Sequence, residues 1–162
     1  MASEPSMQPP EPPDEHAPAA TAGLGIRLVA RLLDGLLVFI PASIVLAIVG
    51  LPAPTMGLGG LSAWTHSLVT SLLWFGYYVA LESGSGQTVG KRLVNIRVVG
   101  SQGGTPTVSE AATRNVWTLF GLVPIVGGLA QLVAVIVIAV TIGSSPQHRG
   151  KHDEFAGTTV MS

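Results

Sequence analysis

The chain lacks cysteine and has few charged residues. Only 10% of its 162 residues are Asp, Glu, Lys or Arg, whereas soluble domains carry about 25%. The absence of cysteine excludes a disulfide scaffold and a cysteine-ligated metal site, although it does not identify the compartment. So few charges leave little polar surface for a chain that is 48% hydrophobic. The composition therefore predicts an integral membrane protein.

The apolar residues are gathered in three segments without Asp, Glu, Lys or Arg, at residues 35–51, 61–81 and 115–147. The first, counted from Leu32, and the second reach the roughly 20 residues that cross a bilayer core. We therefore expect an all-α membrane protein, a small bundle of three to four hydrophobic helices. The expected helices are at about 26–50, 61–82, 108–122 and 128–144.

The third segment is too long for one straight crossing, because 33 residues would make a helix of roughly 50 Å. Gly121, Pro124, Gly127 and Gly128 mark a break within it. Basic residues after the second piece favour a hairpin that enters and returns, which puts the C-terminus in the cytoplasm. The alternative is an interfacial helix followed by one span, which puts the C-terminus outside.

The first 22 residues differ from the rest in composition. They are rich in Pro, Glu and Ala, and they hold four acidic residues and no Lys or Arg. Such a segment cannot bury enough apolar surface to order itself. We predict a disordered acidic tail, or a partner ligand of polyproline II type, followed by one membrane domain at residues 23–162.

The basic residues give the orientation. Arg27 and Arg31 come before the first hydrophobic segment, and Lys91, Arg92 and Arg97 follow the second. Because Lys and Arg are in excess in cytoplasmic loops, the N-terminus is expected in the cytoplasm and loop 51–60 on the far side. Lys91, Arg92 and Arg97 are expected to form a patch that contacts anionic lipid headgroups.

Two local patterns lie between the second and third segments. The β-branched residues at 96–99 and a following Gly-Gly turn predict a short strand, for which the closing Thr-Thr-Val-Met is a candidate partner. Thr107 and Glu110 have the spacing of a capping box that begins a helix. Glu110 and Arg114 are also spaced for a modest ion pair.

Asp34 is the acidic residue that enters the first apolar segment. On a helix, Arg27 and Arg31 lie on the same side as Asp34, and Arg31 is the nearest candidate to compensate its charge. A carboxylate inside a membrane costs about 2.5 to 3.5 kcal/mol on insertion scales. Two interpretations stay open: Asp34 is an ion or proton site, or it is a structural carboxylate that fixes the first helix through its arginines.

Three blocks resemble one known family. RLVARLLD at the first segment, GQTVGKRLVNIRVV after the second and KHDEFAGTTV near the end together are similar to the RDD family of bacterial membrane proteins, over about residues 23–160. That family is named for one arginine and two aspartates, which correspond here to Arg27, Asp34 and Asp153. The resemblance implies a membrane location and a suggested role in transport, and it implies no defined activity.

Several near misses do not support a catalytic or ligand site. GSGQTVGKR lacks the first glycine and the Lys-Ser/Thr ending of a phosphate-binding loop. His148 and His152 are spaced for a metal site on a helix, but Gly150 between them argues against a stable helix. His66 and Glu82 are read as solvated ends of the second segment. We expect no enzyme activity, no cofactor, no metal and no nucleic-acid partner.

Two functions follow from these observations. In the first, the chain is a small non-catalytic membrane module that binds another membrane protein or complex and helps to assemble it. In the second, it is a transporter or ion exchanger with Asp34 as the charge-binding residue. The second requires a homo-oligomer, because three or four helices without an internal repeat cannot enclose a path alone.

Overall fold

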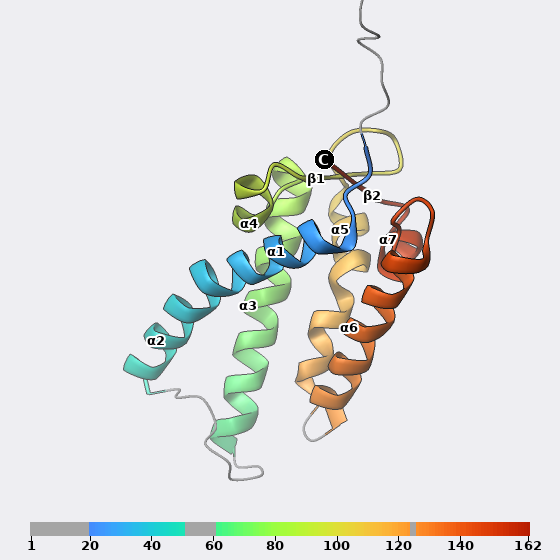
Figure 1. Cartoon of the computed structure of the whole chain (residues 1–162). Coiled ribbons are helices and arrows are strands. Elements are labelled where there is room, and N and C mark those ends of the chain that lie inside the picture. Colours follow the sequence, from blue (N-terminus) through green and yellow to red (C-terminus); the bar gives the residue numbers. More distant parts are fainter. Residues whose placement is uncertain (1–19, 51–60, 124–125) are drawn as a thin grey trace, which may run out of the picture.

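The computed structural model describes residues 20–50, 61–123 and 126–162, and most of them are helical (Figure 1). The elements are α1 (Leu24–Asp34), the π-helix η1 (Gly35–Phe39), α2 (Ile40–Ile48), α3 (Leu61–Ser85), α4 (Val89–Leu93), β1 (Arg97–Val99), α5 (Val108–Asn115), the 3-10 helix η2 (Val116–Leu122), α6 (Val126–Ser144), α7 (Lys151–Ala156) and β2 (Thr159–Met161). Each of the four segments expected to form a hydrophobic helix contains helix in the structure. Most of the predicted tail, and loop 51–60, lie outside the described residues.

The first hydrophobic helix runs through α1, η1 and α2 without interruption. Pro41 has no N–H to donate and its ring conflicts with regular α-helical geometry in the preceding turn. The chain accommodates it with the π turn of η1, in which the Ile40 N–H bonds to the Gly35 carbonyl five residues back. The first hydrophobic helix therefore contains a π turn just before Pro41.

The third hydrophobic segment folds back on itself. Helices α5 and η2 run away from the end that carries α7 and the strands, and α6 returns toward it (Figure 1). The reversal is tight, since a Cβ on Gly127 would lie 2.1 Å from the Phe120 carbonyl oxygen. This return agrees with the predicted hairpin. Pro124, which was expected to mark the break, lies outside the described residues.

One end of the molecule collects the short elements. Strands β1 and β2 pair antiparallel, with Val98 opposite Val160, as predicted. The two valines form a small core with Ala22, Ala30 and Ile96. The Ala22 N–H also donates to the Val160 carbonyl at 2.8 Å. The predicted tail boundary at residue 22 is therefore too late, because residues 20–22 already belong to the folded domain.

Two helices of the described chain are long and apolar enough to cross a membrane. They are Leu24–Ile48 and Val126–Ser144, and only 11% of the most apolar window of each is buried in the protein. Their apolar side chains thus face outward, which lipid tolerates and water does not. The predicted span at 61–82 is less apolar, since α3 carries hydroxyl groups and Glu82. That this helix also crosses remains a prediction.

Candidate functional site: a buried charge network

Seven ionisable side chains from five helices gather at the end that carries the strands. We call them the buried charge network: Arg27, Arg31, Asp34, Glu82, Lys91, Arg114 and Asp153. Its three carboxylates are completely buried. A buried carboxylate is tolerated only when charges and hydrogen bonds satisfy it, so the donors to each carboxylate decide what the network can do.

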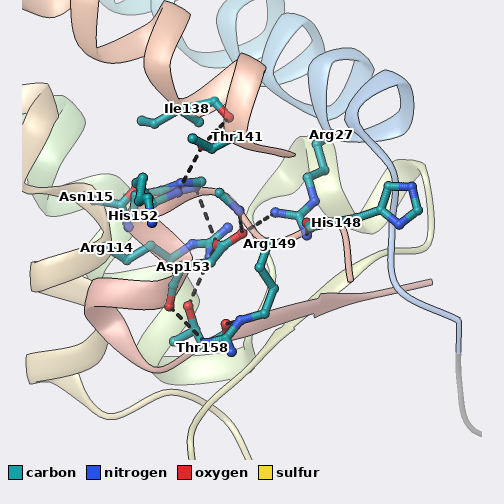
Figure 2. A network of polar contacts seen from close by, with 12 residues as sticks. Arg27, Arg114, Asn115, Ile138, Thr141, His148, Arg149, His152, Asp153 and Thr158 are labelled. Carbon is teal, nitrogen blue, oxygen red and sulfur yellow. Dashed lines mark hydrogen bonds and ion pairs between the residues drawn. The ribbon is translucent and has the colours of Figure 1, made fainter. Parts of the chain in front are cut away.

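Asp153 lies in the first turn of α7 and joins three parts of the chain (Figure 2). One carboxylate oxygen accepts from Nη1 of Arg27 at 2.5 Å and from the Gly150 N–H at 3.0 Å. The other pairs with Nη1 of Arg114. Arg27 in turn donates to the carbonyls of Ala22 and His148, at 2.8 and 2.6 Å. Asp153 therefore fixes the start of α1 and the end of α5 to α7.

Glu82, near the end of α3, is the centre of a second cluster. Its carboxylate pairs with Nζ of Lys91 and lies 3.3 Å from Nε of Arg114. Nδ2 of Asn115 donates to it at 2.8 Å. Arg114 thus bridges Glu82 and Asp153, and the two clusters form one network.

Three expectations for these residues are wrong. Glu82 is buried rather than a solvated helix end. Lys91 is 5% exposed and pairs with Glu82, so its ammonium is turned away from lipid headgroups. The expected pair of Glu110 with Arg114 is replaced, because Glu110 accepts hydrogen bonds from Ser101 and Thr107 and completes the predicted capping box.

Asp34 is satisfied by neutral donors. Its carboxylate accepts from the Tyr77 hydroxyl and the Thr88 hydroxyl, both at 2.8 Å, and from the Gly90 N–H at 2.7 Å. No ion pair joins Asp34 to a basic residue among those that the structure describes. The expected pairing of Asp34 with Arg27 or Arg31 is wrong. Arg27 pairs with Asp153 instead, and the guanidinium of Arg31 lies over aromatic rings.

The block GQTVGK supplies two of these donors. Thr88 caps the start of α4 by accepting from the Lys91 N–H, and its hydroxyl hydrogen remains for Asp34. Gly90 allows α4 to approach α1 closely, since a Cβ there would lie 2.1 Å from the Ala30 carbonyl oxygen. The block therefore holds a carboxylate of the chain rather than a phosphate.

Arg31 lies between two aromatic rings. Its guanidinium carbon is 3.7 Å from the ring centre of Tyr78 and 5.3 Å from that of Trp117. Nη2 donates to Oδ1 of Asn115 at 3.2 Å. Cation–π contacts of this kind stabilise a desolvated guanidinium. They do not use the N–H groups of Nη1, which has no hydrogen-bond partner among the described residues.

Burial lowers the pKa values of two basic groups on the short helices. Burial lowers the pKa of Lys91 to about 8, even though the Glu82 carboxylate acts in the opposite direction. Burial and then the nearby arginines lower the pKa of His152 far below its ordinary value. His152 is therefore neutral at physiological pH, and its 3.4 Å contact with Asp153 is not an ion pair.

The remaining candidates are placed as follows. Arg92 and Arg97 are exposed and stay candidates for headgroup contact. His66 is buried rather than a solvated end. His148 and His152 do not share a helix, because α7 begins at Lys151. Within the described ranges, no three His, Cys, Asp or Glu residues gather as a metal site would require.

Sequence reasoning missed Glu82, Arg114, Asn115, Thr88 and Tyr77 as parts of the site. One feature of the sequence could have identified Glu82 as a site residue. It lies near the end of α3, after 21 residues of that helix that carry no charge. Its partners are 9, 32 and 33 residues away. No local pattern announces contacts at such separations.

One of three comparisons with known proteins found a match. A family model described as the RDD family matches residues 21–157. That range begins just before α1, which carries Arg27, and ends just after α7, which carries Asp153. Searches of curated proteins and of solved structures returned no match.

Proposed function

This chain belongs to the RDD family, and from that premise we propose that it is a small non-catalytic integral membrane protein, an accessory module that binds another membrane protein or complex. The observation that carries the proposal is the saturation of all three network carboxylates by donors of the chain itself. Carboxylates engaged in this way hold helices together. They are poorly placed to serve as a general base or as a cation ligand.

We further propose that the bilayer surrounds α1–α2, α3, η2 and α6, with both termini in the cytoplasm. Helix α4 and strand β1 lie at the end of the molecule that carries the C-terminus (Figure 1), and they contain the exposed Arg92 and Arg97. An excess of Lys and Arg at one end favours the cytoplasmic face. The network then lies at the depth of the inner headgroups, where paired charges are less costly than at the bilayer centre.

The direct test of the accessory role is purification from native membranes. The tagged chain is crosslinked in the membrane, extracted in a mild detergent and analysed for partners by mass spectrometry. The same protein without residues 1–19 is the matched variant, because the acidic Pro-rich segment is the candidate recruiting element. A specific partner recovered with the full chain supports the proposal. A chain that consistently emerges alone contradicts it.

The alternative is a transporter or ion exchanger subunit that uses Asp34 as its ion or proton site. Asp34 lines a cavity, which favours this alternative, but its three hydrogen bonds from the chain weaken it. Reconstitution in vesicles with an imposed ion gradient distinguishes the two. Flux that depends on the protein and is lost in Asp34→Asn, but not in Glu154→Gln, would establish the transporter.

A further inference from the structure

A cavity of about 230 Å³ is lined in part by the charge network and lies between α1, α4, α5, η2, α6, α7 and β2. Its polar wall contains Arg27, Asp34 and Lys91 of the network and four further polar residues: Arg31, Arg114, Trp117 and His152. The opposite wall is apolar and comes from α1 and α6: Leu24, Leu28, Val135, Ile138, Ala139 and Ile142. Figure 2 shows Ile138 on the α6 side, with His152 and Arg114 nearby. A cavity with one cationic and one apolar wall fits an amphipathic ligand.

Each of the four polar residues carries a buried nitrogen without a hydrogen-bond partner among the described residues. The atoms are Nη1 of Arg31, Nε of Arg114, Nε1 of Trp117 and Nδ1 of His152. Nε of Arg114 still has the Glu82 carboxylate at 3.3 Å, whereas Nη1 of Arg31 and Nε1 of Trp117 have no acceptor within the part of the chain that the structure describes. Buried guanidinium and indole N–H groups almost always find an acceptor. The residues that carry these groups line one cavity, and a ligand there with acceptor oxygens would supply the missing acceptors.

The charges select an anion over a neutral ligand. The network contains four cations and three carboxylates, and His152 is neutral, so one positive charge is in excess. Water could satisfy the N–H groups but would leave that charge uncompensated. Arg31 is the network cation that forms no ion pair among the described residues, and the Glu82 and Asp34 carboxylates act on its charge only without direct contact. A phosphate oxygen beside Arg31 and Trp117 would satisfy both requirements.

The apolar wall favours a phospholipid over a free phosphate ion as the source of the phosphate. Leu28 and Val135 are 55% and 43% exposed, on the two helices whose apolar surface faces outward. An acyl chain can leave the cavity along these side chains and stay in contact with hydrocarbon. A free phosphate ion would gain nothing from this wall.

We propose that this cavity binds the phosphate of an anionic phospholipid, with Arg31 and Trp117 as the donors and α1 and α6 as the wall for its acyl chains. The inference assumes the membrane insertion of the proposed function, and it is independent of any protein partner. Bound lipid would bridge α1 to α6, which contact one another sparsely in the fold. The module would then be fully ordered only in a membrane that supplies this lipid.

The test is lipid retention measured by native mass spectrometry of the full chain. The chain is reconstituted with phosphatidylglycerol, with phosphatidylcholine, or with phosphatidylcholine plus inorganic phosphate. We expect selective retention of phosphatidylglycerol. Arg31→Gln and Trp117→Phe are each expected to lower its affinity on the order of tenfold, the loss of one charge-assisted or buried hydrogen bond. Arg92→Gln removes an exposed positive charge from the same end and should retain wild-type affinity.

Each result decides the proposal. Equal retention of both lipids, or an affinity that falls equally in Arg92→Gln, would overturn it, as would unchanged affinity in Trp117→Phe. Displacement of the lipid by inorganic phosphate at similar concentration would overturn the lipid assignment. If Arg31→Gln does not fold, Trp117→Phe alone still tests the proposal, because it removes one hydrogen-bond donor and leaves every charge of the network in place. Partner recovery in the crosslinking experiment is unaffected by these outcomes.

Discussion

The guanidinium of Arg27 and the carboxylate of Asp153 lie 2.5 Å apart, although 126 residues separate them in the sequence. Both are buried, and Arg114 contacts the same carboxylate. The contact joins α1, at the start of the matched family region, to α7 at its end. Two of the three residues that the sequence resemblance matches to the family's arginine and aspartates therefore form one buried ion pair.

Removing the negative charge of Asp153 is predicted to be strongly destabilising. Asp153→Asn leaves Arg27 and Arg114 without their shared counter-charge, and breaking a buried pair costs about 3 to 5 kcal/mol. The measurement is denaturant unfolding in detergent. Glu154→Gln is the matched control, because Glu154 forms an exposed pair with Lys151, and such pairs contribute about 1 kcal/mol or less. Equal stability of the two variants would contradict a structural role for Asp153.

A methyl group at Gly90 is predicted to separate α4 from α1. Gly90→Ala would place Cβ 2.1 Å from the Ala30 carbonyl oxygen and displace the N–H that Asp34 accepts. Overpacking of this kind costs roughly 1 to 3 kcal/mol. Gly84→Ala is the control, since nothing lies within 4 Å of its Cβ position in α3. The control should be neutral or slightly stabilising. If both variants unfold at the same temperature, the close contact of α4 with α1 is wrong.

The loop before α5 is predicted to lose stability in acid. Hydrogen bonds from Ser101 and then Thr107 lower the pKa of Glu110 to about 2, below its ordinary value of 4.5. Because the folded-state pKa is the lower one, the contribution is complete above pH 4.5 and is lost as pH falls toward 2. NMR titration of the Glu110 carboxyl in the folded protein measures its titration midpoint, the pH at which half of the groups are protonated. Thr107→Val removes one donor and should raise it, and a midpoint near 4.5 in the wild type would contradict the cap.

Much of the fold is predictable from the sequence. Uncharged segments gave the hydrophobic helices, and the Gly and Pro residues at 121–128 located the reversal before α6. The β-branched residues of β1 and the closing Thr-Thr-Val-Met identified both strands. These features are local, since each depends on residues a few positions apart. A proline in a helix signals a local disturbance but not that it takes the form of a π turn, and no residue pattern in Val116–Leu122 predicts the 3-10 geometry of η2.

The site was only partly predictable. The family resemblance identified Arg27, Asp34 and Asp153, and all three lie in or beside the buried charge network. Their partners were assigned incorrectly where helical spacing was used, because Arg31 is close to Asp34 along α1 but turns to Tyr78 and Trp117. A hydroxyl such as that of Thr88 carries no sign in the sequence that it will satisfy a carboxylate 54 residues away.

Measuring the orientation of the chain in the bilayer is the most direct test of the account. Because the chain has no cysteine, each introduced cysteine is the only site that a maleimide can label. Single cysteines at Thr105, Ser162 and Thr55 are labelled with a membrane-impermeant maleimide in inverted and in right-side-out vesicles. Thr105→Cys and Ser162→Cys should react in inverted vesicles, and Thr55→Cys, in the uncharged loop, should react in right-side-out vesicles. Labelling of Thr105 and Ser162 from opposite faces, or of all three from one face, would contradict a charge network held at the cytoplasmic side by helices that cross the membrane.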